Sequence, residues 1–176
     1  MFYSMHFGWD LQKNLQKRIR ERHFGELLVG AAEVAETGDS DIPYCIAAPT
    51  MRVPMILAET PNAYLAARAV FLLLLHGKFD SSFGPALDGI FVAVYSLLNG
   101  TGKPYHSVIQ TVAFPGLGTG VGRVPYEVCA RQVRAAYLDH ACGQYQFPAT
   151  WSDAQVNSIR FDECTHVFIG ISSEAV

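Results

Sequence analysis

Residues 108–140 read VIQTVAFPGLGTGVGRVPYEVCARQVRAAYLDH, and this stretch decides the fold. Its first part, 108–114, is mostly apolar and rich in β-branched residues, which predicts a strand covered on both faces. Pro115 ends that segment, and four alternating glycines come after it. Pro125 then suits the first turn of a helix, because its missing N–H has no hydrogen-bond partner to lose there. The stretch therefore predicts a buried strand, a glycine-rich loop and a helix, in that order.

The glycine-rich loop contains Gly116, Gly118, Gly120 and Gly122. A residue without Cβ lets the backbone turn with positive φ and come close to a ligand. Successive backbone N–H groups at the start of a helix form a site for phosphate. One glycine alone would indicate a flexible turn, whereas four in alternation favour an anion site. We also expect a side chain added at Gly120 to crowd the loop.

Two familiar phosphate-binding motifs are excluded by the same residues. No Gly-Lys-Ser/Thr comes after the loop, so it is not a Walker loop. Val121 stands where the last glycine of the dinucleotide fingerprint would fall. The anion site is therefore predicted from the alternation of glycines and its position between a strand and a helix.

The composition predicts one domain, residues 1–176, with a sizeable apolar core. Half of the residues are hydrophobic, and the net charge is −3, from 13 basic and 16 acidic residues. This balance argues against nucleic acid as the main partner. The longest apolar runs, 69–75 and 90–98, are too short to span a bilayer, and no signal peptide is visible, so no membrane partner is expected.

The cysteines and histidines indicate neither a disulfide framework nor a metal site. The cysteines have no CxxC spacing, which favours reduced core thiols of a cytoplasmic protein. They are Cys45, Cys129, Cys142 and Cys164. The six histidines have no spacing that suits a metal ion, so neither a metal nor a cofactor is expected.

The upstream part of the chain alternates predicted helices and strands. Residues 9–22 have an apolar residue every four positions against a basic outer face, which predicts a helix. Residues 26–36 are interpreted as a strand with a bend or bulge at Gly30. Residues 37–41 form a turn, and the apolar run 44–48 predicts a central strand.

Thr50 and Arg52 come directly after that central strand, and open α/β sheets place ligands at such a strand end. Arg52 is therefore a candidate for contact with an anionic group, and a plain surface arginine between two prolines is an equal alternative. Thr60 and Pro61 next predict a helix start, with Thr60 as the N-cap, and the helix extends to Gly77.

The remaining segments complete an alternating pattern. Residues 87–99 favour a buried helix over a strand, a short helix is predicted within 152–159, and 165–171 predicts a last strand. Strands that alternate with helices indicate an α/β protein with a mixed or mostly parallel sheet.

Residues 112–125, VAFPGLGTGVGRVP, resemble a segment of the macro domains, which bind ADP-ribose. In that family a strand ending in Phe-Pro leads to a Ser/Thr-Gly-Val/Ile loop and a Pro-led helix. Residues 30–50 are similar to the family's Gly-x-Ala, Thr-Gly, Leu-Pro and strand order. Residues 62–68 fall where the next helix of that fold begins. The resemblance covers roughly 2–140, and the predicted last strand also fits.

The resemblance implies a three-layer α/β/α macro-domain-like fold with a mixed sheet and an ADP-ribose cleft. It implies that Gly118, Thr119, Gly120 and Val121 hold the diphosphate and the distal ribose through backbone N–H groups. The expected ligand is ADP-ribose or an ADP-ribosylated target, and an active enzyme would be an ADP-ribosyl hydrolase. The full set of candidate ligand-binding residues is Gly116, Gly118, Thr119, Gly120, Val121, Gly122, Arg123, Thr50 and Arg52.

This chain departs from the family pattern in two places. Residues 2–8 resemble the segment just after the family's first glycine-rich loop. The resemblance therefore implies either a domain whose N-terminal piece is omitted from this sequence or an N-terminally shortened member with half of the site. The asparagine used by many hydrolytic members is therefore absent, and no catalytic residue is assigned. Gly122 and Arg123 stand where the family often has an aromatic residue, which makes Arg123 a further candidate for phosphate contact.

Two other functions remain open. One is a catalytically inactive structural or interaction protein that keeps the fold and associates through an exposed sheet edge, with a homo-oligomer as one outcome. The other is an unrelated α/β nucleotide enzyme, which would bind NAD or ATP and ignore ADP-ribose.

Overall fold

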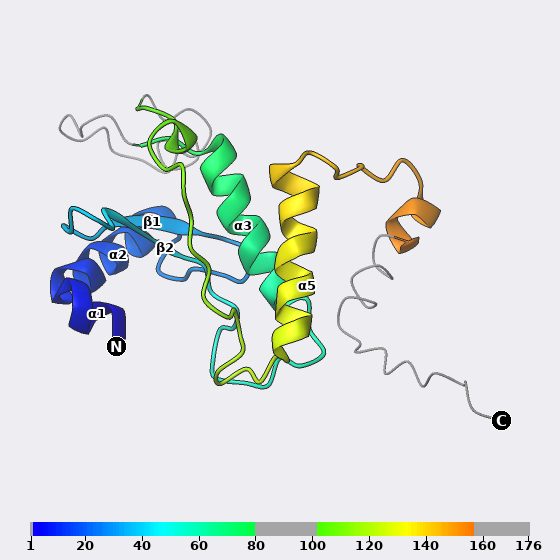
Figure 1. Cartoon of the computed structure of the whole chain (residues 1–176), viewed down its shortest axis with the longest axis horizontal. Helices are drawn as coiled ribbons and strands as arrows, with labels where there is room; N and C mark the ends of the chain where they lie inside the picture. The colour runs from blue at the N-terminus through cyan, green and yellow to red at the C-terminus, as the bar shows by residue number, and fades with distance from the viewer. Residues whose placement is uncertain (1, 80–101, 157–176) are drawn as a thin grey trace.

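The structure, a computed structural model, describes residues 2–79 and 102–156. Its described part combines helices with a small two-stranded sheet, so the general α/β class is confirmed (Figure 1). The elements are α1 (Phe2–Phe7), α2 (Trp9–Arg22), β1 (Glu33–Glu36), β2 (Tyr44–Ala47), α3 (Asn62–His76) and α5 (Tyr126–Ala136). A 3₁₀ turn covers Tyr105–Ser107, and a π-helical turn, Tyr137–Ala141, continues α5.

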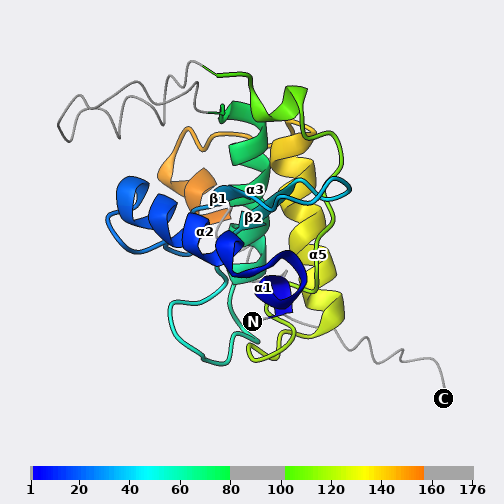
Figure 2. The same cartoon turned by 90° about the vertical axis from the view of Figure 1, so that its left-hand side faces the viewer.

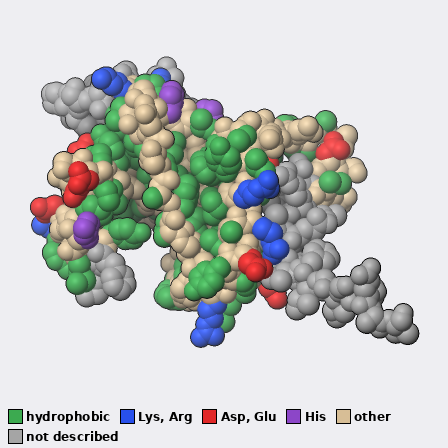
Figure 3. Space-filling view, in the orientation of Figure 1, with side chains coloured by type: hydrophobic (Ala, Val, Ile, Leu, Met, Phe, Trp, Pro, Cys, Tyr) green, Lys and Arg blue, Asp and Glu red, His purple; other side chains and the backbone are tan. Residues whose placement is uncertain are grey.

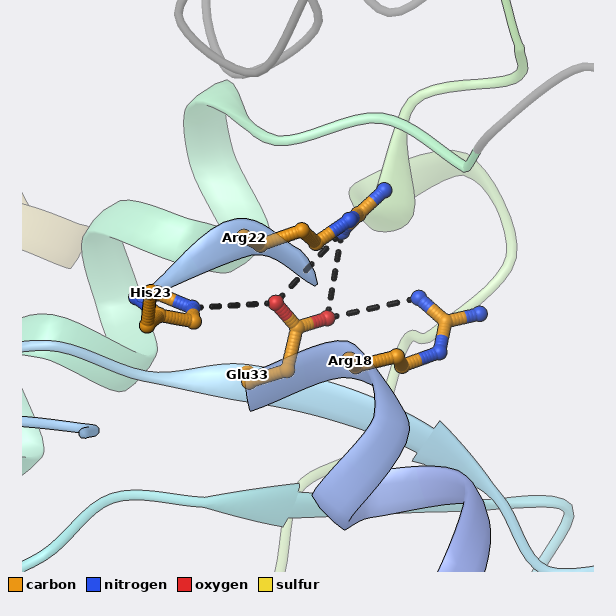
Figure 4. A network of polar contacts seen from close by, with 4 residues as sticks. All are labelled: Arg18, Arg22, His23 and Glu33. Carbon is orange, nitrogen blue, oxygen red and sulfur yellow. Dashed lines mark hydrogen bonds and ion pairs between the residues drawn. The ribbon is translucent and has the colours of Figure 1, made fainter. Parts of the chain in front are cut away.

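Helix α2 spans the predicted residues and lies against β1. The carboxylate of Glu33, on β1, links the two elements through contacts with side chains at the end of α2. The side chain of Glu33 is almost fully buried. It accepts hydrogen bonds from Arg22 at 3.1 Å and Arg18 at 3.3 Å, and His23 Nε2 lies 3.1 Å away (Figure 4). A buried carboxylate of this kind needs such partners, because it has lost its water.

The sheet is a two-stranded antiparallel ladder, in which Glu33 faces Ala47 and Glu36 faces Tyr44. The strand expected over 26–36 is shorter than predicted: its first part is a turn, where the Ala31 N–H donates to Leu28 O and Gly30 has φ of 91°. The second strand is found where it was expected. It is half-buried along its whole length, and not a fully covered central strand.

The strand predicted over 108–114 is wrong. This segment has no ladder partner among the described residues, and Val108 is 43% exposed. Three of its side chains, Ile109, Val112 and Phe114, nevertheless pack onto the core cluster around Val34. β-branched and aromatic residues indicate a half-buried extended surface, and packing alone meets that preference without a ladder.

Helices α3 and α5 lie side by side in both views (Figures 1 and 2). The predicted extent of α3 is confirmed, but its N-cap is not Thr60: Pro61 precedes the helix, and the Thr60 hydroxyl donates to Leu57 O at 2.9 Å. Gln132 of α5 does the capping instead. Its Oε1 accepts from the Tyr64 N–H at 3.1 Å, and its Nε2 donates to Thr60 O at 2.9 Å.

Several expectations fall wholly or partly outside the described residues. They are the buried helix of 87–99, the strand of 165–171, the end of the short helix predicted within 152–159, and Cys164. The described part of that short helix covers 151–156. Cys129 is buried as expected, whereas Cys142 is exposed and is therefore no core thiol. Within the described ranges, every helix is too short or too polar to cross a membrane.

Candidate functional site

Two loops meet beside the first turn of α5 (Figures 1 and 2). The first connects β2 to α3 and covers 48–61; the second is the glycine-rich loop, 115–125. The Leu57 N–H donates to Gly122 O at 2.7 Å and joins the loops directly. Beneath them lies a shared hydrophobic cluster of Leu57, Ala63, Val124, Val128 and Cys129. The fold therefore brings together two segments that the sequence analysis assigned separately to ligand binding.

The glycine-rich loop folds as two consecutive turns. In the first, the Thr119 N–H donates to Gly116 O at 3.2 Å, and the Thr119 hydroxyl donates to the same oxygen at 2.9 Å. In the second, the Arg123 N–H donates to Gly120 O at 3.1 Å. The Val124 N–H then donates to Gly118 O at 3.1 Å and closes the loop onto the start of α5.

Two of the four glycines, Gly118 and Gly122, are required by the loop itself. Gly118 has φ of 72°, which a residue with a side chain adopts only with strain. A Cβ at Gly122 would lie 2.5 Å from Gly118 O, and one at Gly116 would lie 2.5 Å from Thr119 Oγ1. Gly120 is different, because nothing lies within 4 Å of a Cβ built there. The expectation that a side chain at Gly120 crowds the loop is therefore wrong.

The N–H groups of Gly118, Gly120 and Val121 donate no hydrogen bond to any other described residue. Gly120 and Val121 are exposed and Gly118 is half-buried, so these groups can meet a ligand, whereas Gly122 is buried. Arg123 is exposed beside them, with φ of 54°. Backbone N–H groups without an acceptor of their own, in a loop that leads into a helix N-terminus, are able to bind phosphate oxygens.

Thr50 and Arg52 lie in the β2–α3 loop, and each already has a partner within the chain. The Thr50 carbonyl accepts a hydrogen bond from Asn62 Nδ2 at 2.8 Å. Arg52 forms a two-point ion pair with Glu26: Nε donates to Oε1, and Nη2 donates to Oε2 at 3.0 Å. This pairing raises the pKa of Arg52 and lowers the pKa of Glu26. The charge of Arg52 is thus already balanced by a partner that the sequence did not indicate.

A cavity of about 550 Å³ opens beside the Arg52–Glu26 ion pair. The side chains that line it come from the loop after α2, from the β2–α3 loop and from the start of α3. They are Glu26, Val29, Met51, Arg52, Val53, Met55 and Asn62. Only Arg52 was predicted as a site residue, because the others are ordinary apolar or surface residues in sequence and only the fold gathers them.

The two-loop end also carries exposed hydrophobic side chains. Figure 3 shows hydrophobic side chains there, with basic atoms at the lower tip of the molecule. The exposed residues from the two loops and the start of α5 are Val53, Met55, Ile56, Val121 and Tyr126. A surface that combines apolar side chains with unbonded amides suits a ligand that has both an apolar and an anionic part.

A second polar cluster joins the middle of the molecule to the end of α5. The Tyr64 hydroxyl donates to Asp139 Oδ2 at 3.1 Å and lies 3.3 Å from His140 Nε2. Burial, with the nearby Asp139, raises the pKa of Tyr64. Burial, with the positive charge of Arg68, lowers the pKa of His140. The π-helical turn places Asp139 and His140 here, and the sequence analysis assigned a role to neither.

Reactive thiols and metal clusters do not add to the candidate site. Burial raises the pKa of Cys129, so its thiol is less nucleophilic than a free cysteine. Within 2–79 and 102–156, no group of three or more histidine, cysteine or acidic residues is placed to hold a metal ion. The chemistry available at the two-loop end is therefore hydrogen bonding from the backbone, the positive charge of the exposed Arg123 and contact with apolar side chains.

Comparison with known proteins gives no match: no family model, no curated protein and no solved structure is similar to this chain.

Proposed function

We propose that this chain binds ADP-ribose or a related nucleotide diphosphate at the glycine-rich loop. The observation that carries the proposal is the set of N–H groups of Gly118, Gly120 and Val121, which have no acceptor among the described residues. Diphosphate oxygens are acceptors of the right charge for these donors. The positive end of α5, which begins at Tyr126, adds to the attraction.

The resemblance of 112–125 to the macro domains supports the same ligand class. We extend the proposal to the three-layer α/β/α macro arrangement with a mixed sheet, and to hydrolysis at the distal ribose as the reaction of an active form. In such a reaction the loop amides would hold the diphosphate while water attacks the anomeric carbon of the distal ribose and displaces the modified target, or attacks an attached acyl group and releases it from the ribose hydroxyl as a carboxylic acid. No side chain is assigned as acid, base or nucleophile, so binding is the activity to test first.

The test is isothermal titration calorimetry with ADP-ribose, with ADP, ATP and NAD as comparison ligands. We expect a micromolar Kd for ADP-ribose, which corresponds to about −8 kcal/mol. Gly120→Val should remove this binding, because the new side chain occupies the space that a ligand on the Gly120 amide needs. The fold should survive, since nothing lies within 4 Å of a Cβ at that position.

The matched control is Ala113→Val, which adds a similar apolar group at an exposed residue just before the loop. It should bind ADP-ribose as the wild type does. A folded Gly120→Val variant with unchanged affinity would contradict the loop as the binding site. Tight binding of NAD or ATP, with no heat from ADP-ribose, would favour an unrelated nucleotide enzyme.

A second candidate function is favoured by the sheet. The ladder of β1 and β2 has no third strand among the described residues, so its outer edges form no ladder hydrogen bonds there. Open edges can pair with a strand of another chain. A structural protein that associates in this way should elute as a dimer or larger species in size-exclusion chromatography with light scattering. A strictly monomeric protein at all concentrations would count against it.

A further inference from the structure

Residues 143–156, called the arm below, follow α5 and carry the most exposed large hydrophobic side chains of the described chain. Phe147 is 87% exposed and Trp151 is 86% exposed. Within the arm only Pro148 and Ala154 are half-buried, and none of its residues packs against a hydrophobic core cluster. Aromatic side chains that stand in water to this extent are typical of a surface that binds another protein.

The part of the arm that carries Trp151 has a defined backbone. The Thr150 N–H donates to Asp153 Oδ2 at 2.9 Å, and the Asp153 N–H donates to Thr150 Oγ1 at 3.2 Å. These reciprocal bonds cap the start of the helix of 151–156, in which Trp151 is the first residue. The tryptophan is therefore presented on an ordered helical turn, so less chain has to be ordered when it binds.

We propose that Trp151 of one copy inserts into the cavity beside Arg52 and Glu26 of a second copy, so that two chains exchange their arms. The volume of the cavity, about 550 Å³, lies within the range of about 300–1,000 Å³ that suits small organic groups, and it has room for an indole ring. This inference makes no use of the glycine-rich loop and does not rest on the proposed function.

The lining of the cavity has the chemistry that holds an indole ring. Met51 and Met55 contribute polarizable thioethers, which make favourable contacts with aromatic rings. Two hydrogen bonds to Glu26 hold the Arg52 guanidinium in place, and guanidinium planes stack on aromatic rings. Burial of an aromatic side chain against these groups removes apolar surface of both copies from water.

The indole N–H also finds an acceptor in the cavity. Asn62 lines the cavity, and its Nδ2 donates to Thr50 O at 2.8 Å. The Asn62 amide oxygen accepts no hydrogen bond from a described residue, so it can accept one from the indole N–H of Trp151. A tryptophan that becomes buried needs such a partner for its N–H.

A second copy is the occupant because the arm extends away from its own cavity. Figure 1 shows the short helix of the arm beyond α5, on the side opposite to α2 and the sheet. The cavity is lined by residues that follow α2 and β2, together with the start of α3. Each copy has one arm and one cavity, so two copies related by a two-fold axis can fill both cavities and close as a dimer.

Tryptophan fluorescence, combined with light scattering, tests the exchange, because the chain has two tryptophans. Trp9→Phe leaves Trp151 as the sole tryptophan, and Trp9 is itself exposed. As the protein concentration rises, we expect the mass to change from monomer to dimer and the Trp151 emission to shift to shorter wavelength. A dimer with unshifted emission, or a protein that stays monomeric at all concentrations, would overturn the inference.

Two pairs of variants locate the contact. Met55 lines the cavity, whereas Ile56 is the next residue, is exposed and does not line it. We expect Met55→Glu to raise the Kd of the dimer at least about tenfold, which corresponds to about 1.4 kcal/mol, and Ile56→Glu to leave it unchanged. Trp151→Ala should weaken the dimer similarly, and Trp9→Ala should not. All four side chains are exposed, so the fold should survive each change.

The variants also separate this contact from pairing of the sheet edges. A dimer whose Kd is the same in Met55→Glu and Ile56→Glu, or in Trp151→Ala and Trp9→Ala, would overturn the inference and favour association through β1 and β2.

A mixing experiment identifies the second copy as the occupant. The first protein, Trp9→Phe with Met55→Glu, keeps Trp151 but has an altered cavity. The second, Trp9→Phe with Trp151→Ala, has no tryptophan and an intact cavity. Adding the second to the first should shift the Trp151 emission to shorter wavelength, and a second protein that also carries Met55→Glu should not shift it. No shift with the intact cavity, or the same shift with both, would overturn the inference.

Discussion

The cluster around Glu33 and the glycine-rich loop both gather hydrogen-bond donors around one point, and they differ in where the acceptor comes from. At Glu33, two arginines and a histidine converge on a carboxylate that β1 itself supplies (Figure 4). At the glycine-rich loop, the donors are backbone N–H groups, and no described residue supplies an acceptor for Gly118, Gly120 or Val121. The donors around Glu33 bond to an acceptor within the protein and so hold α2 against β1. The N–H groups of the glycine-rich loop have no such acceptor and are available to a ligand.

The difference extends to exposure. Glu33 is 3% exposed, and the side chains that surround it are themselves largely buried, so the cluster is a closed structural contact. Val121, by contrast, is 68% exposed. A buried polar cluster such as that around Glu33 contributes to the free energy of unfolding. An exposed set of donors such as that of the glycine-rich loop contributes to ligand binding. Substitutions at Glu33 should therefore change the free energy of unfolding, whereas substitutions at the exposed Gly120 and Val121 should change ligand binding.

The largest expected effect is at Glu33. Glu33→Gln leaves Arg18 and Arg22 partly buried without the carboxylate that neutralises them. We expect the free energy of unfolding to fall by about 3 kcal/mol, because the buried ion pairs that join α2 to β1 are lost. Urea denaturation followed by circular dichroism measures the change.

The control for Glu33 is Glu21→Gln, which removes a surface carboxylate 3.9 Å from Lys17. It should change the free energy of unfolding by less than about 0.5 kcal/mol. Equal effects of the two substitutions would mean that the Glu33 cluster does not fasten α2 to β1.

The next effect contrasts two glycines of one loop. Gly122→Ala should lower the free energy of unfolding by about 2 kcal/mol, because its Cβ would lie 2.5 Å from Gly118 O, a backbone atom that cannot move away easily. Gly120→Ala should change it by less than about 0.5 kcal/mol. Thermal or urea unfolding of both variants measures the two changes. A Gly120→Ala variant as unstable as Gly122→Ala would contradict the difference in packing between the two glycines.

Tyr64 is a third hydrogen-bond donor to compare. As at Glu33, its acceptor is a carboxylate of the protein, here that of Asp139. Tyr64→Phe removes the hydroxyl that donates to Asp139, a residue only 2% exposed. We expect a loss of about 1.5 kcal/mol in the free energy of unfolding, the cost of removing one hydrogen bond to a buried charged group. Tyr126→Phe is the control, because Tyr126 is exposed, and it should leave the unfolding curve unchanged.

The sequence predicted α2, α3 and α5 because their signals are local, and it did not predict α1. The four-residue spacing of apolar residues marked α2, Pro61 marked the start of α3, and Pro125 marked the start of α5. The strand of 108–114 was predicted on the same local grounds and is wrong. Several of its apolar side chains pack against the core as expected, but a ladder requires a neighbouring strand in register, and no local pattern specifies one.

In the candidate site, too, features with a local sequence signal could be predicted, and features set by contacts between distant segments could not. The glycine-rich loop could be located from its alternating glycines, yet the sequence could not say which glycine the fold requires, because Gly122 is constrained by Gly118 O across the turn. The partner of Arg52 could not be predicted, since Glu26 lies 26 residues away. The cap of α3 by Gln132 is likewise a contact between distant segments, and a glutamine inside a helix gives no signal for it.

The smallest expected effect is a pH dependence of the free energy of unfolding that comes from His140. It tests whether the polar cluster of Tyr64, Asp139 and His140 is buried, in contrast to the exposed glycine-rich loop. Burial and then the charge of Arg68 lower the pKa of His140 in the folded protein. An unfolded histidine has a pKa of about 6.5. Between the lowered folded value and about 6.5, the unfolded chain therefore binds more protons than the folded one, and the stability from His140 falls as the pH falls through this window. Above about pH 6.5 that stability is fully present.

His140→Gln should remove this part of the pH dependence, because glutamine does not titrate. The measurement is the free energy of unfolding of wild type and variant at pH values from about 5 to 8, compared as a difference. Relative to His140→Gln, the free energy of unfolding of the wild type should fall as the pH falls below about 6.5. A difference that stays constant across this range would mean that His140 titrates alike in both states, and the contact with Tyr64 would then be as open to water as the glycine-rich loop.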